Sequence, residues 1–232
     1  MESQIAETRE RIMVALDLPD AAEALTMRDR LTGRVGWFKV GLRLFVAEGP
    51  DFVRELLQAH RIFLDLKFHD IPNTVAQAVS SAGDLGVKML NVHAAGGPRM
   101  LAAAAEAARD YPDMRLIAVT VLTSDDMPAD QARALAVERA RMARDAGLHG
   151  VVCSVHEAEA IKSACGNDFV TVTPGIRWGD ASHDDQSRIA DPAGAVRAGS
   201  DYLVIGRPIL RAPDPAAAAD EAAAMMVQAN GR

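Results

Sequence analysis

The chain has 232 residues, of which 49% are hydrophobic and 25% charged, a composition typical of soluble globular proteins. The excess of 32 Asp and Glu over 25 Lys and Arg gives a net charge of -7, which disfavours nucleic acids and anionic membranes as partners. The 2 cysteines lack the spacing of a zinc site and are too few for a disulfide framework. The length suits one domain covering residues 1–232.

The amino-terminal segment of residues 1–13 is polar, and no long apolar run follows it anywhere in the chain. An export signal or a membrane-spanning helix would require such a run. We therefore expect a cytoplasmic protein that neither leaves the cell nor spans a membrane.

Short apolar or β-branched segments alternate about eight times with longer segments of helical periodicity. In chain order, strands are predicted at residues 11–17, 35–41, 61–67, 87–93, 114–122, 149–154, 168–174 and 201–206. Helix start signals containing proline lie between them, at residues 19–20, 50–51, 72–73, 98 and 191–192. The Ala-rich residues 214–230 are predicted to form the last helix.

This alternation indicates the fold class. Eight units of about 29 residues each would hold one strand, one helix and two short loops, with no linker left over. The sequence therefore predicts a single-domain (β/α)8 barrel, or TIM barrel. A doubly wound open sheet is less favoured, because ALDLPD after the first strand is not a glycine-rich phosphate loop.

In such a barrel, functional side chains lie at the carboxyl ends of the strands. Because side chains alternate along a strand, Asp65 and Lys67 are predicted to point inward with Phe63. The same parity turns Lys39 and Asp17 inward. An isolated Asp-x-Lys pair is usually a solvated ion pair worth less than about 1 kcal/mol. Four charges of alternating sign at one mouth would instead fix each other's ionisation and position.

The segment DLKFHDIPNT, residues 65–74, resembles the signature of the orotidine 5'-phosphate decarboxylase family. Other blocks resemble that family in the same order: ALD ending at Asp17, FKVG with Lys39, VTVLTS with Thr123, TPGIR ending at Arg177, DDQ ending at Gln186 and IGR ending at Arg207. The resemblance implies conversion of orotidine 5'-monophosphate to uridine 5'-monophosphate and CO2, the last step of de novo synthesis of that nucleotide. It also implies a homodimer of barrels that uses no metal and no organic cofactor.

The resemblance further assigns catalytic roles. Lys67 would stabilise the carbanion formed at C6 and then protonate it. Asp65 would lie beside the departing carboxylate and orient Lys67. Lys39 would complete the charge network, and Asp70 would reach across the dimer into the partner's site.

Substrate-binding roles follow from the same resemblance. Lys39 and Asp17 would bind the ribose hydroxyls, with Asp65 beside them, and Thr74 would come from the partner. The base and phosphate contacts are assigned to Thr123, Gln186, Arg177, Gly206 and Arg207. Glycine at the end of the last strand allows close approach of an anion, and the arginine after it offers a bidentate clamp. The polar residues 175–189 form a long loop and are the candidate lid.

Two other functions stay open at this point. A magnesium-dependent sugar-phosphate decarboxylase or aldolase of the same barrel superfamily shares the Asp-x-Lys-x-x-Asp pattern. That chemistry needs an acidic ligand on the second strand, where this chain has Lys39. A noncatalytic nucleotide-phosphate sensor would have no need for an ammonium at Lys67 held against a carboxylate.

Overall fold

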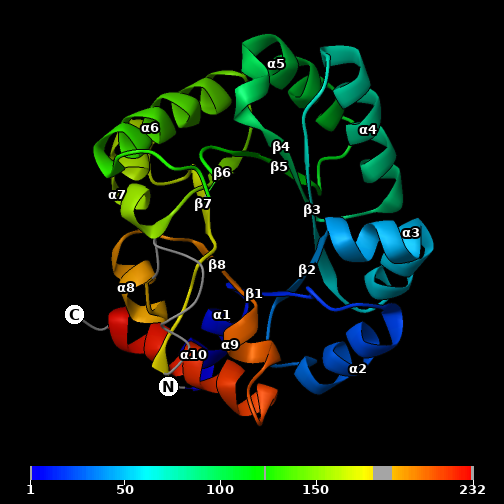
Figure 1. Ribbon diagram of the computed structural model, residues 1–232, viewed down its shortest axis with the longest axis vertical. Coiled ribbons are helices and arrows are strands. Elements are labelled where there is room, and N and C mark those ends of the chain that lie inside the picture. The colour runs from blue at the N-terminus through cyan, green and yellow to red at the C-terminus, as the bar shows by residue number, and fades with distance from the viewer. Residues whose placement is uncertain (1, 123, 180–189, 231–232) are drawn as a thin grey trace.

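Eight parallel strands form a closed barrel in sequence order, with helices around it (Figure 1). The computed structural model describes residues 2–122, 124–179 and 190–230. The strands are β1 Ile12–Ala15, β2 Trp37–Gly41, β3 Arg61–Phe68, β4 Met89–His93, β5 Arg115–Val119, β6 Gly150–Val152, β7 Val170–Thr173 and β8 Tyr202–Ile205. The predicted (β/α)8 barrel is confirmed, and most strands are slightly shorter than predicted.

The helices follow the strands in the order expected for this fold. They are α1 Glu2–Arg9, α2 Ala21–Leu31, α3 Leu42–Leu57, α4 Pro72–Leu85, α5 Gly97–Ala108, α6 Ala129–Asp145, α7 Val155–Cys165, α8 Pro192–Arg197, α9 Arg207–Leu210 and α10 Pro215–Asn230, with a 3₁₀ helix, η1, at Ala94–Gly96. Proline stands in the first turn of α4, α5 and α8 as predicted. None of the helices in the described ranges has the length and apolar character needed to cross a bilayer.

The α3 helix contains the predicted start at Pro50, but it begins earlier, at Leu42. Gly49 has a φ of 71°, so the helical path is interrupted there and resumes at Pro50. The sequence therefore identified the second part of α3 and missed the first. That first part follows β2 directly and lies at the rim of the barrel.

Side-chain alternation along the strands produces two apolar cores. The inner core fills the barrel with Met13, Ala15, Trp37, Phe63, Met89, Ile117, Val172 and Val204. Intervening residues such as Val14, Phe38 and Leu64 face outward and pack in the larger core beneath the helices. The inner set continues in parity to Asp17, Lys39 and Asp65, so the predicted inward direction of these three side chains agrees with the packing.

β3 departs from regular pairing near its carboxyl end. Leu64 pairs with Leu90 and Phe68 with Val92, so β3 is bulged relative to β4 between these pairs. Lys67 lies in this irregular segment with a φ of 52°, and it is the one non-glycine residue with positive φ among those described. Such a conformation costs about 1–3 kcal/mol and persists only where neighbouring contacts impose it. The predicted inward direction of Lys67 therefore arises from a bulge and not from simple alternation.

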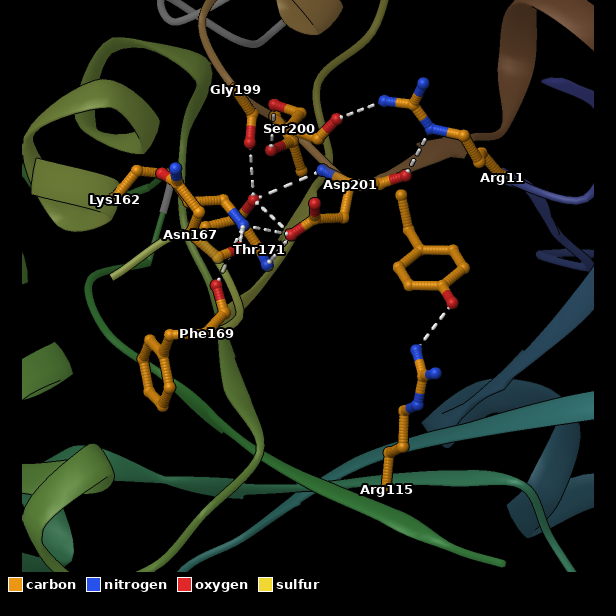
Figure 2. Close-up of polar contacts among 11 residues, drawn as sticks. Arg11, Arg115, Lys162, Asn167, Phe169, Thr171, Gly199, Ser200 and Asp201 are labelled. Carbon is orange, nitrogen blue, oxygen red and sulfur yellow. Dashed lines mark hydrogen bonds and ion pairs between the residues drawn. The ribbon is translucent and has the colours of Figure 1, made fainter. Parts of the chain in front are cut away.

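A polar cluster joins α7, β7 and the residue before β8 at the amino-terminal end of the barrel, and Figure 2 shows its contacts. Asp201 Oδ2 accepts hydrogen bonds from Lys162 Nζ at 2.6 Å, from the Thr171 backbone N–H at 2.7 Å and from Thr171 Oγ1 at 3.1 Å. Lys162 Nζ also donates to the carbonyl oxygens of Asn167 and Phe169, at 2.8 and 3.0 Å. The cluster ties neighbouring elements together at the end of the barrel opposite the mouth.

We expect Asp201→Ala to lower the free energy of unfolding by about 2 kcal/mol, because a half-buried lysine and a backbone N–H lose their shared acceptor. The matched control is Asp113→Ala, which removes the surface partner of Lys88 at 3.3 Å. Since that pair is exposed, its loss should cost less than about 1 kcal/mol. Urea unfolding measures both variants. Equal losses in the two would contradict a structural role for the Asp201 cluster.

Candidate active site

A pocket of about 420 Å³ opens at the carboxyl ends of the strands. Its lining includes seven of the residues singled out from the sequence: Asp17, Lys39, Asp65, Lys67, Arg177, Gly206 and Arg207. A larger groove of about 980 Å³ lies on the outer surface along α6 and contains none of these residues. The pocket at the strand ends is therefore the candidate active site.

Four charged side chains form a chain of ion pairs in this pocket. Asp65 is at its centre, with Oδ1 2.6 Å from Lys67 Nζ and Oδ2 3.2 Å from Lys39 Nζ. Lys39 Nζ also lies 3.2 Å from Asp17 Oδ1. The side chains of Lys39 and Asp65 are 9% and 13% exposed, whereas that of Lys67 is 34% exposed. The Lys67 ammonium is thus both held by a carboxylate and accessible from the pocket.

The network keeps its buried members charged. Burial acts to raise the pKa of Asp65, but Lys39 and Lys67, together with hydrogen bonds from Lys67 and Asn91, hold that pKa below its ordinary value. Burial acts to lower the pKa of Lys39, but Asp65 and Asp17 raise it above its ordinary value. At neutral pH the carboxylate of Asp65 and the ammonium of Lys39 are therefore both ionised.

Gly41, the last residue of β2, makes room for the Lys39 ammonium. A Cβ atom at this position would lie 3.1 Å from Lys39 Nζ and 3.5 Å from Asp17 Oδ1. The 3.1 Å spacing is tighter than nine in ten real Cβ contacts, so a side chain at Gly41 would require the Lys39 ammonium to shift by a few tenths of an ångström, whereas 3.5 Å is an ordinary contact. Its role could not be predicted from the sequence, because it depends on where the Lys39 side chain lies.

Asn91 on β4 is the main member of the site that the sequence analysis missed. Its Nδ2 donates to Asp65 Oδ1 at 2.6 Å, and its Oδ1 accepts from the backbone N–H of Lys67 at 2.8 Å. The signal was available, because Asn91 has the same inward parity as Met89 and is a polar residue within an apolar strand. A buried polar side chain at such a position needs partners, and charged residues on the next strand can supply them.

The arginines lie on the side of the pocket formed after β7 and β8. Arg207 begins α9 immediately after Gly206, and Arg177 follows β7 and is 8% exposed. Arg177 Nη1 donates to the Ile176 carbonyl at 2.9 Å, and its backbone N–H donates to the Ala190 carbonyl at 2.9 Å. Two guanidinium groups and the backbone at Gly206 thus give this side of the pocket the chemistry of an anion site.

Asp70 and Thr74 are placed elsewhere in this chain. Both are exposed, and neither lines the pocket that holds Lys67. The Asp70 carboxylate accepts a hydrogen bond from the backbone N–H of Ile71 at 2.7 Å. Asp70 instead borders a separate, shallow hollow of about 520 Å³. Thr123 and Gln186 lie outside the described residues.

Comparisons with known proteins identify the family of this chain. Residues 10–222 match the model of the Orotidine 5'-phosphate decarboxylase / HUMPS family. The orotidine 5'-phosphate decarboxylase of Moorella thermoacetica is 51% identical, with 93% of this chain and 92% of the relative covered. That of Legionella pneumophila (strain Paris) is 50% identical, with 88% and 94% covered.

Solved structures give the same result. The crystal structure of orotidine 5'-phosphate decarboxylase from Lactobacillus acidophilus superimposes with a TM-score of 0.80 and 33% identity, covering 93% of this chain and 98% of that one. An uncharacterized conserved protein from Geobacillus kaustophilus gives a TM-score of 0.79 and 37% identity, covering 93% and 99%. The family resemblance inferred from the motifs is confirmed, and the chain belongs to the orotidine 5'-phosphate decarboxylase / HUMPS family.

Proposed function

We propose that this protein converts orotidine 5'-monophosphate to uridine 5'-monophosphate and CO2, the last step in de novo synthesis of that pyrimidine nucleotide. The observation that carries the proposal is the Lys67 ammonium, held 2.6 Å from Asp65 in a pocket at the carboxyl ends of the strands. Relatives that are about half identical over most of the chain bear the name of this activity.

The reaction places a specific demand on the site. When the bond between C6 and the carboxylate breaks, its electron pair stays on C6 as a vinylic carbanion with no adjacent electron sink. The uncatalysed barrier is therefore very high, and the enzyme has to lower it by an amount near the top of the usual range, about 23 kcal/mol. A fixed cation beside C6 is the direct way to stabilise that charge.

Lys67 supplies this cation in our proposal. Its ammonium stabilises the developing negative charge and then donates a proton to C6, which leaves a neutral amine that solvent reprotonates. Because the side chain is 34% exposed, the proton can be replaced from the pocket. No electron acceptor is required, since the carbon that loses CO2 gains a proton.

Asp65 and Lys39 set the electrostatic field in which Lys67 acts. Asp65 orients Lys67 and lies where the departing carboxylate would be repelled in the ground state. Lys39 keeps Asp65 ionised, and together with Asp17 it is proposed to bind the ribose hydroxyls. These charges are fixed before the substrate arrives, so little reorganisation is needed during the reaction.

The side of the pocket formed after β7 and β8 is proposed to bind the phosphate. Arg177, Gly206 and Arg207 would contact it, while Thr123 and Gln186 are proposed to contact the base. The phosphate is remote from C6, and its binding free energy can be used to position and desolvate the reacting ring.

Magnesium-dependent sugar-phosphate chemistry on the same barrel fits the charge network less well. The Lys39 ammonium lies 3.2 Å from Asp65 Oδ2. A divalent cation would need this carboxylate oxygen as a ligand. A cation bound at that point would be repelled by Lys39. The donor set at the end of β2 therefore favours cofactor-independent decarboxylation.

We also propose that two copies of the chain form a homodimer in which Asp70 and Thr74 enter the partner's site. Both residues are exposed, and so are the large apolar side chains of Ile71, 66% exposed, and of Leu42 and Val46 on α3, 56% and 79% exposed. The elements α3 and α4 are neighbours on one side of the barrel (Figure 1). An isologous contact would cover these apolar side chains in both copies.

The expected cellular setting is the cytoplasm, without nucleic acid or membrane partners. The acidic balance of the chain, -7 at pH 7, supports the second part of this proposal. The chain has only 2 cysteines, too few for a disulfide framework, which suits a reducing compartment.

The activity is tested with purified protein treated with a chelator and given orotidine 5'-monophosphate, following the ultraviolet change on conversion to uridine 5'-monophosphate. The wild type should turn over, and Lys67→Ala should lose at least about a thousandfold in kcat, since it removes both the cation and the proton donor. Lys39→Glu should be similarly impaired. Lys88→Ala, at a surface ion pair, is the control and should match the wild type.

Other outcomes separate the competing functions. A requirement for added magnesium, or turnover of a sugar phosphate instead, would favour the metal-dependent activity. Substrate binding without turnover by the wild type would favour the sensor. Full activity in Lys67→Ala would refute the proposed mechanism.

The shared site is tested by mixing two inactive variants, Lys67→Ala and Asp70→Ala, after reversible dissociation. A mixed dimer holds one site in which both residues are intact, so random pairing should restore about a quarter of wild-type activity. If Asp70 acted in its own chain's site, each mixed dimer would hold two damaged sites and no activity would return. Monomeric protein at all concentrations in analytical ultracentrifugation would also contradict the proposal.

A further inference from the structure

Asn91 lies behind the charge network and not in the pocket. It has no exposed surface, and it is not among the described residues that line the pocket. Any influence it has on a bound ligand must therefore pass through its two partners, Asp65 and Lys67. We propose that Asn91 is a positioning residue that uses a single amide group to fix the Asp65 carboxylate and the Lys67 backbone. This inference rests on the proposed decarboxylation and names a residue that serves it.

The first contact orients the carboxylate. Asn91 Nδ2 donates to Asp65 Oδ1 at 2.6 Å, the oxygen that also lies 2.6 Å from Lys67 Nζ. The other oxygen, Oδ2, lies 3.2 Å from Lys39 Nζ. With donors from three strands, the carboxylate cannot rotate without losing a contact. Its direction towards the Lys67 ammonium is thereby set.

The second contact holds the backbone from which Lys67 projects. β3 is out of register with β4 between Leu64 and Phe68, and Lys67 has a φ of 52° in this segment. Its N–H donates to Asn91 Oδ1 at 2.8 Å. A side-chain acceptor thus stands where regular strand pairing is interrupted, and it stabilises the left-handed conformation that aims the lysine.

The residue type matters as much as the position. A neutral amide offers one acceptor and one donor group side by side, and here the acceptor takes the Lys67 N–H while the donor takes the Asp65 oxygen. Leucine has the same branched skeleton, a larger volume and neither function. Aspartate keeps the acceptor for Lys67 but sets a second carboxylate against Asp65. These two substitutions therefore separate the contacts.

The amide donor also affects ionisation. Burial acts to raise the pKa of Asp65, and Lys39, Lys67 and the hydrogen bonds from Lys67 and Asn91 lower it. Removing the Asn91 donor should move this pKa upward, and a neighbouring carboxylate should move it further. The reaction uses the ionised carboxylate, so the acid limb of kcat/KM should move to higher pH in both variants. Both variants keep the charged groups that face Asp65, namely Lys39, Lys67 and the more distant Asp17.

The experiment compares Asn91→Leu and Asn91→Asp with Thr171→Val. Thr171 is equally buried and donates to the Gly199 carbonyl at 2.9 Å, at the opposite end of the barrel. We expect Asn91→Leu to lower kcat by at least about a hundredfold with little change in KM, because a small misplacement of reacting groups is sufficient for such a loss. The apparent pKa of the acid limb of kcat/KM should be higher in Asn91→Leu than in the wild type, and higher still in Asn91→Asp. Thr171→Val should lose stability and keep both kcat and the acid limb.

A second readout does not depend on turnover. The ¹³C resonance of the Asp65 carboxyl, followed in an NMR pH titration of the unliganded protein, reports its pKa directly. It should rise from wild type to Asn91→Leu to Asn91→Asp and stay constant in Thr171→Val. If Asn91→Leu unfolds, the isosteric Asn91→Asp variant carries the test through both readouts.

Failure of the two proposals can be told apart. If the wild type turns over but the Asn91 variants keep its kcat, acid limb and Asp65 titration, the positioning role is refuted and the activity stands. If the wild type shows no turnover, the proposed function fails, while the NMR titration still decides whether Asn91 fixes Asp65.

Discussion

The site depends on one carboxylate shared between two ammonium groups. Asp65 Oδ1 lies 2.6 Å from Lys67 Nζ and Oδ2 lies 3.2 Å from Lys39 Nζ. Charges of this kind are unfavourable when buried alone, and they become tolerable when partners at these distances compensate the lost hydration. Asp65 and Lys39 are nearly buried, so each makes the other's ionised state possible. The Lys67 ammonium, which is more exposed than that of Lys39, is then available to a ligand.

The barrel explains why these residues can converge although they are far apart in the chain. Neighbouring parallel strands bring Asp17, Lys39 and Asp65 to the same edge, and alternation turns all three towards the axis. Below them the inner core fills the barrel with apolar side chains. The charges therefore lie between this apolar core and the open pocket. There the effective dielectric constant is lower than in bulk water, so ion pairing is stronger.

The barrel and the inward direction of Asp17, Lys39 and Asp65 could be predicted from the sequence, because both follow from periodicity. The activity was predicted from motifs that resemble those of the family. The bulge at Lys67 could not be predicted, since it depends on how β3 pairs with β4 and not on the local sequence. The inward direction of Asn91 could have been inferred from its parity with Met89, but its two partners could not, because they depend on how β3 and β4 pair. The early start of α3 was missed because its N-cap residue is Gly41, which has no side chain to form a capping hydrogen bond.

The left-handed backbone at Lys67 has a consequence for how this position can change during evolution. Glycine adopts a φ near 52° without strain, and asparagine adopts it more readily than lysine does. A barrel of this shape that was selected for folding alone would drift towards those residues at this place. Retention of lysine there opposes the conformational preference of the backbone. The residue at position 67 in a descendant of this protein would therefore indicate whether selection for catalysis is still present.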